Sequence, residues 1–232
     1  MSLNVVNSVT LRPEEAIEFL QLVGEFASKA KAKKDAQHWE AYRTLFGNNQ
    51  IVHFTSRGEK FAEIGPRGDI QALWQRVLGE KPGLQHFART NACIQSAQQT
   101  IAIERADLSY SPAASASAPP FALVTAVRAR PGQAEALEDL LRKLAEAIPK
   151  ADDPTRLESY QVLVGELSSY YTVRPLDELA DLDEQLPAPE LLARAFGQAE
   201  GGLIWRSGSA AVEHGERSIV ALVPELSNSQ AG

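Results

Sequence analysis

Two stretches of the chain carry the same spacing of apolar side chains. The shared positions are Phe19, Leu22, Val23, Phe26, Ala27 and Ala30 in the first stretch, and Leu137, Leu140, Leu141, Leu144, Ala145 and Ile148 in the second. The spacing i, i+3, i+4, i+7, i+8, i+11 places all six side chains on one face of a helix. Each stretch is therefore predicted to form an amphipathic helix that packs on one face of a sheet.

Short segments rich in β-branched and aromatic residues flank each predicted helix, as expected of strands. One strand precedes each helix and is followed at once by proline, which suits the first turn of a helix. Two strands follow each helix and are joined by a short glycine-containing connection, which is typical of a hairpin. The preceding strands are Asn4–Leu11 and Phe121–Ala129, and the hairpins are Trp39–Phe46 with Gln50–Ser56 and Leu157–Val164 with Ser168–Arg174.

A second helical region follows each hairpin. These regions are Asp69–Leu78 and Ala188–Phe196, each followed by a stretch that is either helical or irregular and by a final strand, Thr100–Leu108 or Ser218–Leu226. The order strand, helix, strand, strand, helical region, strand is the split βαβ arrangement of a ferredoxin-like domain. The pattern therefore predicts an α+β fold in which antiparallel sheets carry helices on one face.

The two sets of elements are related by a constant offset of 118 residues. Both copies contain Glu-x-Tyr-x-x-Leu-x-Gly, beginning at Glu40 and Glu158, and glycines recur at Gly83 and Gly201. About a fifth of the positions are identical, against roughly one in fifteen by chance. We infer a tandem duplication with domains at 1–110 and 121–228, joined by a Ser/Ala/Pro linker at 111–120.

The composition is that of a globular protein and argues against several kinds of partner. The 232 residues are 44% hydrophobic and 23% charged, as in ordinary soluble globular proteins. The net charge of -7 disfavours nucleic acid, and the basic run Lys29–Lys34 falls where a helix end would attract cations. No apolar run approaches the roughly 20 residues of a membrane span, and one cysteine, Cys93, excludes a disulfide framework. We expect a cytoplasmic protein.

Each hairpin's second strand runs on into a further segment, Val52-His-Phe-Thr-Ser-Arg-Gly-Glu-Lys-Phe-Ala-Glu-Ile in the first copy and Tyr170-Tyr-Thr-Val-Arg-Pro-Leu-Asp-Glu-Leu-Ala-Asp-Leu-Asp in the second, which is similar to a strand-then-short-helix passage of known barrels. With the element order, this passage resembles the dimeric α+β barrel superfamily, which includes antibiotic-biosynthesis monooxygenases and NIPSNAP-type domains. The resemblance covers Asn4–Ser109 and Phe121–Ser227. It implies that the two ferredoxin-like repeats form an intramolecular pseudo-dimeric α+β barrel, in a group whose members oxidise aromatic polyketides, degrade haem or have no known activity.

Two pairs of positions are candidates for the lining of a cavity. His53 and Tyr171 are equivalent and place a hydrogen-bonding ring on a strand in each copy, where the alternative is a ring that only packs. Glu40 with Tyr42, and Glu158 with Tyr160, share a strand face because side chains alternate with period two. Such a carboxylate can act as a general base. Alternatively it pairs with Arg12 or Arg130 and fixes the strand register.

No motif assigns a cofactor. The four histidines, His38, His53, His86 and His214, lack a metal-ligand spacing, and no phosphate loop or nucleophile elbow is present. We therefore predict no metal and no cofactor, with haem left open by the resemblance. Two hypotheses remain: a monooxygenase-like enzyme that binds a small apolar or aromatic ligand, or a non-catalytic scaffold or assembly module. In either case the chain is expected to be a pseudo-dimeric monomer or a homo-oligomer, without nucleic-acid or membrane partners.

Overall fold

The structure, a computed structural model, describes residues 2–65, 69–112 and 118–229. The middle of the predicted linker at 111–120 lies outside these residues. The elements of the first half, in which η denotes a 3-10 helix, are β1 (Leu3–Leu11), η1 (Pro13–Glu15), α1 (Ala16–Ala32), β2 (Glu40–Phe46), β3 (Ile51–Gly58), α2 (Phe61–Ile64), α3 (Ile70–Leu78), α4 (Glu80–Ala92), β4 (Ile94–Glu104) and η3 (Ala106–Leu108).

The second half has nearly the same series of elements. They are β5 (Phe121–Ala129), α5 (Ala134–Lys150), β6 (Glu158–Val164), β7 (Ser169–Leu176), α6 (Asp181–Glu184), α7 (Ala188–Phe196), α8 (Gln198–Ala210), β8 (Val212–Leu222) and η4 (Pro224–Leu226). Every strand, both 3-10 tails and the long helices recur at an offset of 118, and only the short α6 is shifted from its counterpart α2 by two residues. Positions 118 residues apart are called equivalent below.

The predicted strand, helix, strand, strand series is confirmed, but the last strand of each half was placed wrongly. β4 and β8 begin six residues earlier than expected, and residues 106–108 and 224–226 are 3-10 turns. The early part of each strand is polar and exposed, so it lacks the alternation of apolar side chains that marks a half-buried strand. The stretches before these strands, for which the sequence left a helix or irregular structure open, are the helices α4 and α8.

Two glycines set the distance between the paired helices that follow each hairpin. A Cβ on Gly83 would lie 2.6 Å from the Trp74 carbonyl oxygen, and one on Gly201 would lie 2.5 Å from the Leu192 carbonyl oxygen. These contacts are with backbone, which cannot move aside as a flexible side chain does. The helices α3 and α4, like α7 and α8, therefore touch backbone to backbone.

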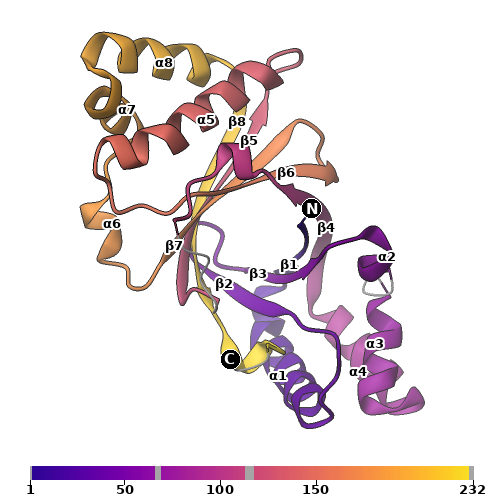
Figure 1. The fold of residues 1–232 in the computed structure, drawn as a ribbon. Coiled ribbons are helices and arrows are strands. Elements are labelled where there is room, and N and C mark those ends of the chain that lie inside the picture. The colour runs from indigo at the N-terminus through magenta and orange to yellow at the C-terminus, as the bar shows by residue number, and fades with distance from the viewer. Residues whose placement is uncertain (1, 66–68, 113–117, 230–232) are drawn as a thin grey trace. The chain divides into compact units, whose positions relative to one another are not determined.

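The strands form a closed barrel in the order β1-β3-β2-β8-β5-β7-β6-β4 (Figure 1). Within each half the first strand pairs antiparallel with the third, and the second strand also pairs antiparallel with the third. The registers are equivalent, since Val9 faces Val52 in the first half and Val127 faces Tyr170 in the second. This is the α+β barrel architecture expected from the sequence.

The chain divides into two compact units. The first comprises Met1–Ala102 with Val220–Gly232, and the second comprises Ile103–Ile219. The core of the first unit is formed between α1, α3 and strands β1, β2 and β3, and includes a stacked pair of rings, Phe26 and Trp74, whose centroids are 4.0 Å apart. The core of the second unit is formed in the same way by α5, α7 and their strands, with Tyr170 as its largest fully buried side chain.

Each unit is completed by a tail that follows a long final strand. In the first unit Leu226 is buried and its carbonyl oxygen accepts a hydrogen bond of 2.8 Å from Trp39 Nε1. In the second unit the equivalent Leu108 is fully buried, and its carbonyl oxygen accepts a hydrogen bond of 2.7 Å from Ser159 Oγ. Among the described residues, no helix combines the length and apolar character needed to cross a bilayer.

Candidate functional site

The strands of the first unit have one face covered by helices and one that is not. Ala41 and Val52 belong to the core beneath the helices. Because neighbouring side chains on a strand point to opposite faces, Tyr42 and His53 lie on the face away from the helices. The sequence alone left this orientation open, because both parities of the strands contain mixed residues. The uncovered surface is called the helix-free face below.

His53 is the centre of a hydrogen-bonded group on this face. Its Nδ1 lies 2.8 Å from Ser8 Oγ on β1, and its Nε2 lies 3.3 Å from Thr44 Oγ1 on β2. A neutral imidazole donates through one nitrogen and accepts through the other, so it satisfies both hydroxyls. Burial without a charged partner lowers the pKa of His53 to about 4. The ring is therefore neutral at physiological pH.

Tyr42 lies directly beside this group, because it is the cross-strand partner of His53. Its side chain is buried, with 8% of its surface exposed. Directly opposed residues on neighbouring strands have Cβ atoms about 5 Å apart. The phenol and the imidazole thus form one polar and aromatic surface, and both were candidate residues from the sequence.

The second unit places the other candidate residues on its own helix-free face. Tyr160 and Tyr171 are cross-strand partners there, as Tyr42 and His53 are in the first unit. The Tyr160 hydroxyl donates a 2.8 Å hydrogen bond to Glu158. The carboxylate and the phenol of this strand therefore contact each other. In the first unit, the equivalent Glu40 shares a strand face with Tyr42, because side chains alternate along a strand.

The histidine group itself is restricted to the first half. The residues equivalent to Ser8, Thr44 and His53 are Ala126, Val162 and Tyr171. The second half forms the same strands with the same register without these polar side chains. The group is therefore not required by the fold. Sequence comparison of the two halves singled out His53 but missed the two hydroxyls, which are ordinary strand residues until the register is known.

The histidines do not fit haem as an axial ligand. Both ring nitrogens of His53 are engaged by hydroxyls, and His38 Nδ1 lies 3.1 Å from the carbonyl oxygen of Asn228. His86 stacks against Trp74 with its Nε2 3.3 Å from Glu25. His214 is exposed on β8. His86 Nε2 is buried without a hydrogen-bond partner, but it lies next to the Glu25 carboxylate, and His38 and His214 are exposed, so none of the four is placed as an axial haem ligand.

One group of possible metal ligands occurs among the described residues: Glu15, Glu18 and Cys93. Glu18 already accepts a hydrogen bond of 2.6 Å from Arg89. Burial and the two carboxylates raise the pKa of the Cys93 thiol, which disfavours the thiolate that binds metals. The Cys93 Sγ instead donates to the carbonyl oxygen of Arg89. Glu18 and Cys93 are therefore already engaged by other groups of the protein.

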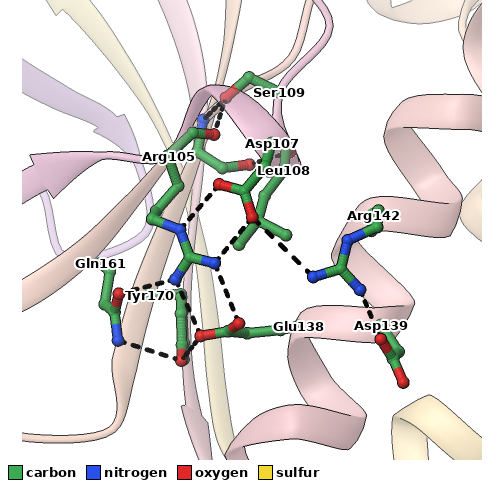
Figure 2. A network of polar contacts seen from close by, with 10 residues as sticks. Arg105, Asp107, Leu108, Ser109, Glu138, Asp139, Arg142, Gln161 and Tyr170 are labelled. Carbon is green, nitrogen blue, oxygen red and sulfur yellow. Dashed lines mark hydrogen bonds and ion pairs between the residues drawn. The ribbon is translucent and has the colours of Figure 1, made fainter.

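The second unit contains a polar network that the sequence did not reveal (Figure 2). Arg105, directly after β4, makes paired hydrogen bonds of 2.9 and 3.0 Å to Glu138 on α5 and two of 2.8 Å to Asp107. It also donates to Gln161, and the Tyr170 hydroxyl donates to Glu138 at 2.6 Å. The Arg105 guanidinium holds the pKa of Glu138 below its ordinary value, and burial with the Glu138 charge raises the pKa of Tyr170.

This network joins the tail, the helix and the sheet of the second unit. Paired hydrogen bonds between a guanidinium and a carboxylate are among the strongest in proteins. Every member has a partner within the network. Its role is to fix the tail of β4 against α5.

Comparison with known proteins identifies the fold. No protein-family model matches the sequence, and no curated protein matches it significantly. An anthrone oxidase-like protein has 15% identity and a TM-score of 0.61 over 99% of this chain and 94% of its own. A protein from Lactobacillus acidophilus NCFM, provisionally named a monooxygenase, has 8% identity and a TM-score of 0.56 over 95% of this chain and 93% of its own.

A third similar structure is the chlorite dismutase of Candidatus Nitrospira defluvii, with 9% identity and a TM-score of 0.54 over 97% of this chain and 92% of its own. At these identities the likeness concerns the fold, and it extends over nearly the whole of each chain. The closed eight-stranded barrel and the doubled ferredoxin-like order agree with it. The chain therefore shares its fold with these three proteins.

Proposed function

We propose that the protein binds a small aromatic or lipophilic molecule on the helix-free face of its first unit and oxidises it in a monooxygenase-like reaction. The observation that carries the proposal is the His53 group. A neutral imidazole held between two hydroxyls, beside a buried tyrosine, occurs in one half and is replaced in the other. Polar side chains that the fold does not need are expected to serve a ligand.

The geometry supports a role for His53 in orientation. A base whose conjugate acid has a pKa of about 4 is too weak to remove a proton from a phenol, whose pKa is near 10. The contact between Nε2 and Thr44 is long, at 3.3 Å, so a substrate hydroxyl can take its place as the donor to this nitrogen. The Tyr42 ring offers an aromatic surface beside that hydroxyl.

The proposed reaction needs no cofactor and no redox-active side chain. An activated methylene between two aromatic rings can react with dioxygen, so that CH2 and O2 give C=O and H2O, with the substrate as the only reductant. The name of the anthrone oxidase-like structure describes a substrate of this kind for that protein. The protein's contribution would be to bind the hydroxylated ring in a fixed position and to exclude water.

The first test is native mass spectrometry and an absorbance scan of freshly purified protein. A co-purified small molecule supports the proposal. 1,8-Dihydroxyanthrone, which has both the activated methylene and phenolic hydroxyls, is then added under air. Conversion to 1,8-dihydroxyanthraquinone is followed by absorbance and oxygen uptake by electrode, with an anaerobic sample as the control. Oxygen-dependent conversion above the uncatalysed rate is expected.

Two variants connect this activity to the site. His53→Tyr introduces the residue that the second half has at the equivalent position, and it should lower kcat/KM at least tenfold through loss of one oriented hydrogen bond. His214→Gln changes an exposed histidine on β8 and should leave the rate unchanged. If 1,8-dihydroxyanthrone and other hydroxylated polycyclic compounds neither bind nor react, the chain is better explained as a scaffold or assembly module.

A further inference from the structure

The first unit has a pocket on the side of the sheet opposite to His53. Its volume is about 220 Å³. The walls are apolar and come from the end of β1, the start of α1 and one strand residue: Leu11, Pro13, Ala16, Leu20 and Val52. The rim is polar and comes from β2 and the hairpin connection: Arg43, Asn49 and Gln50. An apolar interior with a few polar groups at one side is typical of a small-molecule site.

The same place in the second unit is occupied by protein. Val52 is equivalent to Tyr170, whose ring is fully buried, and Leu20 is equivalent to Glu138. Arg43 is equivalent to Gln161. These three residues are the members of the Arg105 network that come from the sheet and the helix (Figure 2). Three pocket-lining positions of the first half are thus network-forming positions of the second.

Equivalent residues occupy equivalent space because the two halves share their strand register and helix bounds. Replacing a tyrosine by valine removes most of a ring from between the sheet and the helix. The tail follows the same pattern, since Val223 in the first unit is equivalent to Arg105 in the second. The first unit therefore lacks the side chains that fill this space in the second.

The two units also differ in where the arginine of this region lies. In the second unit the guanidinium of Arg105 is enclosed by Glu138 and Asp107. In the first unit the guanidinium is on the rim, at Arg43, and no carboxylate of residues 2–65, 69–112 or 118–229 forms an ion pair with it. An arginine fork matches the two oxygens of a carboxylate. Arg43 is exposed to solvent, so its guanidinium is available to an anionic group at the mouth of the apolar pocket.

We propose that this pocket binds a small amphipathic carboxylate, with its apolar body against Leu20 and Val52 and its carboxylate on Arg43. The Asn49 and Gln50 amides lie on the same rim and can complete the hydrogen bonds. The volume limits the apolar body to about one aromatic ring or a short alkyl chain. The site is separate from the one proposed around His53, since Val52 and His53 point to opposite faces of β3.

The experiment uses benzoate and hexanoate as probes, with benzamide and hexanamide as neutral counterparts of the same shape, measured by calorimetry and ligand-observed NMR on the full chain. Both carboxylates are expected to bind, at least tenfold more tightly than the amides, which corresponds to one charge-assisted hydrogen-bonded pair. Arg43→Gln, which introduces the equivalent residue Gln161, should remove this preference and leave amide binding unchanged. Arg194→Gln, at an exposed site of the second unit, controls for net charge.

Two further variants test the location of the apolar body. Val52→Tyr introduces the equivalent Tyr170 and should abolish binding of carboxylates and amides alike. Ala16→Leu narrows the pocket from the first residue of α1, and it provides the same test if Val52→Tyr does not fold. His53→Tyr should bind benzoate as the unmodified protein does, so failure of the oxidation proposal leaves this test intact. No binding at 10 mM benzoate, or binding unaffected by both Arg43→Gln and Ala16→Leu, would overturn the proposal.

Discussion

A buried histidine with no charged partner makes the first unit sensitive to mild acid. The folded-state pKa of His53 is about 4, against an ordinary value of 6.5. Between these values the unfolded chain binds the proton and the folded chain does not, so the free energy of unfolding falls as the pH is lowered through this range. The full loss is about 3 kcal/mol, reached below pH 4.

We predict that His53→Gln removes this dependence. The variant retains a side chain that can donate and accept, but it has no group that titrates near pH 5. The free energy of unfolding in urea is measured for both proteins at pH 7 and pH 5, and the difference between them should shift in favour of the variant at pH 5. An NMR titration that gave His53 a pKa above 6 would contradict the predicted burial of the neutral ring.

The Arg105 network also loses stability as the pH falls, but through a carboxylate that is paired with a cation. Arg105 lowers the pKa of Glu138 from 4.5, so the folded state favours the carboxylate. Its contribution to stability is fully present above pH 4.5 and is lost as the pH falls through the folded-state pKa. The carboxylate is mostly buried, with 21% of its side chain exposed, so screening by water is limited.

Glu138→Gln should therefore cost about 2 kcal/mol of unfolding free energy at pH 7, because Arg105 loses one of its two carboxylate partners. The difference from the unmodified protein should shrink below pH 4. The control is Asp139→Asn on the same helix, whose exposed carboxylate contacts only Arg142 among the described residues. That change should cost less than about 0.5 kcal/mol. Equal effects of the two substitutions would show that the network adds no stability.

At the residue scale, the sequence revealed rings but not their partners. Equivalence to Tyr171 singled out His53, and the alternation of side chains placed Glu158 and Tyr160 on one face, where they do form a hydrogen bond. Ser8 and Thr44 contact His53 only because of the strand register, which no pattern in the sequence specifies. Arg105 was hidden for a similar reason, since its partners lie 33 and 56 residues away along the chain.

At the scale of elements, the two glycines at the helix crossings give a sharp prediction. Gly201→Ala would place a Cβ 2.5 Å from the Leu192 carbonyl oxygen, so α7 and α8 would have to separate. We expect a loss of about 1–3 kcal/mol, the usual cost of overpacking. Gly83→Ala should behave in the same way in the first half, where the Cβ would lie 2.6 Å from Trp74.

The neighbouring Gly202 provides the control for this prediction. A Cβ there would meet only the end of the Arg206 side chain, at 3.4 Å, which can move aside. Because alanine favours a helix over glycine, Gly202→Ala should be neutral or should stabilise the protein by up to about 1 kcal/mol. Urea unfolding of the three variants measures these differences. A similar loss for Gly201→Ala and Gly202→Ala would indicate a general effect of glycine substitution in α8.

The elements were predicted well where side-chain periodicity reports burial, and poorly where it does not. α1 and α5 bury one face along their whole length, and their bounds follow the apolar stripe. After their first residue, β4 and β8 continue with five exposed and mostly polar residues, so only the more buried later parts are recognised as strands. The helices α4 and α8 bury few apolar side chains, because a glycine makes the close contact, and a missing side chain gives no pattern.

At the scale of the whole molecule, the chain is not divided in simple sequence order. The last residues, Val220–Gly232, belong to the compact unit that contains α1, and Ile103–Leu108 belong to the unit that contains α5. The sequence period of 118 is visible without structure, but the unit to which each tail belongs is not. Both tails are short and similar, with a buried leucine as the main apolar anchor.

Paired substitutions test this assignment of the tails. Leu226→Ala removes an almost fully buried side chain from the core beneath α1, and Leu108→Ala removes its equivalent from the core beneath α5. Each should cost about 2–5 kcal/mol, as for other buried leucines. Since each tail belongs to one unit, hydrogen exchange should rise mainly in α1 for Leu226→Ala and mainly in α5 for Leu108→Ala, as followed by mass spectrometry of peptides. The reverse pattern, in which exchange in α5 rises for Leu226→Ala, would contradict this assignment. It would mean that each tail packs against the helix of its own sequence half.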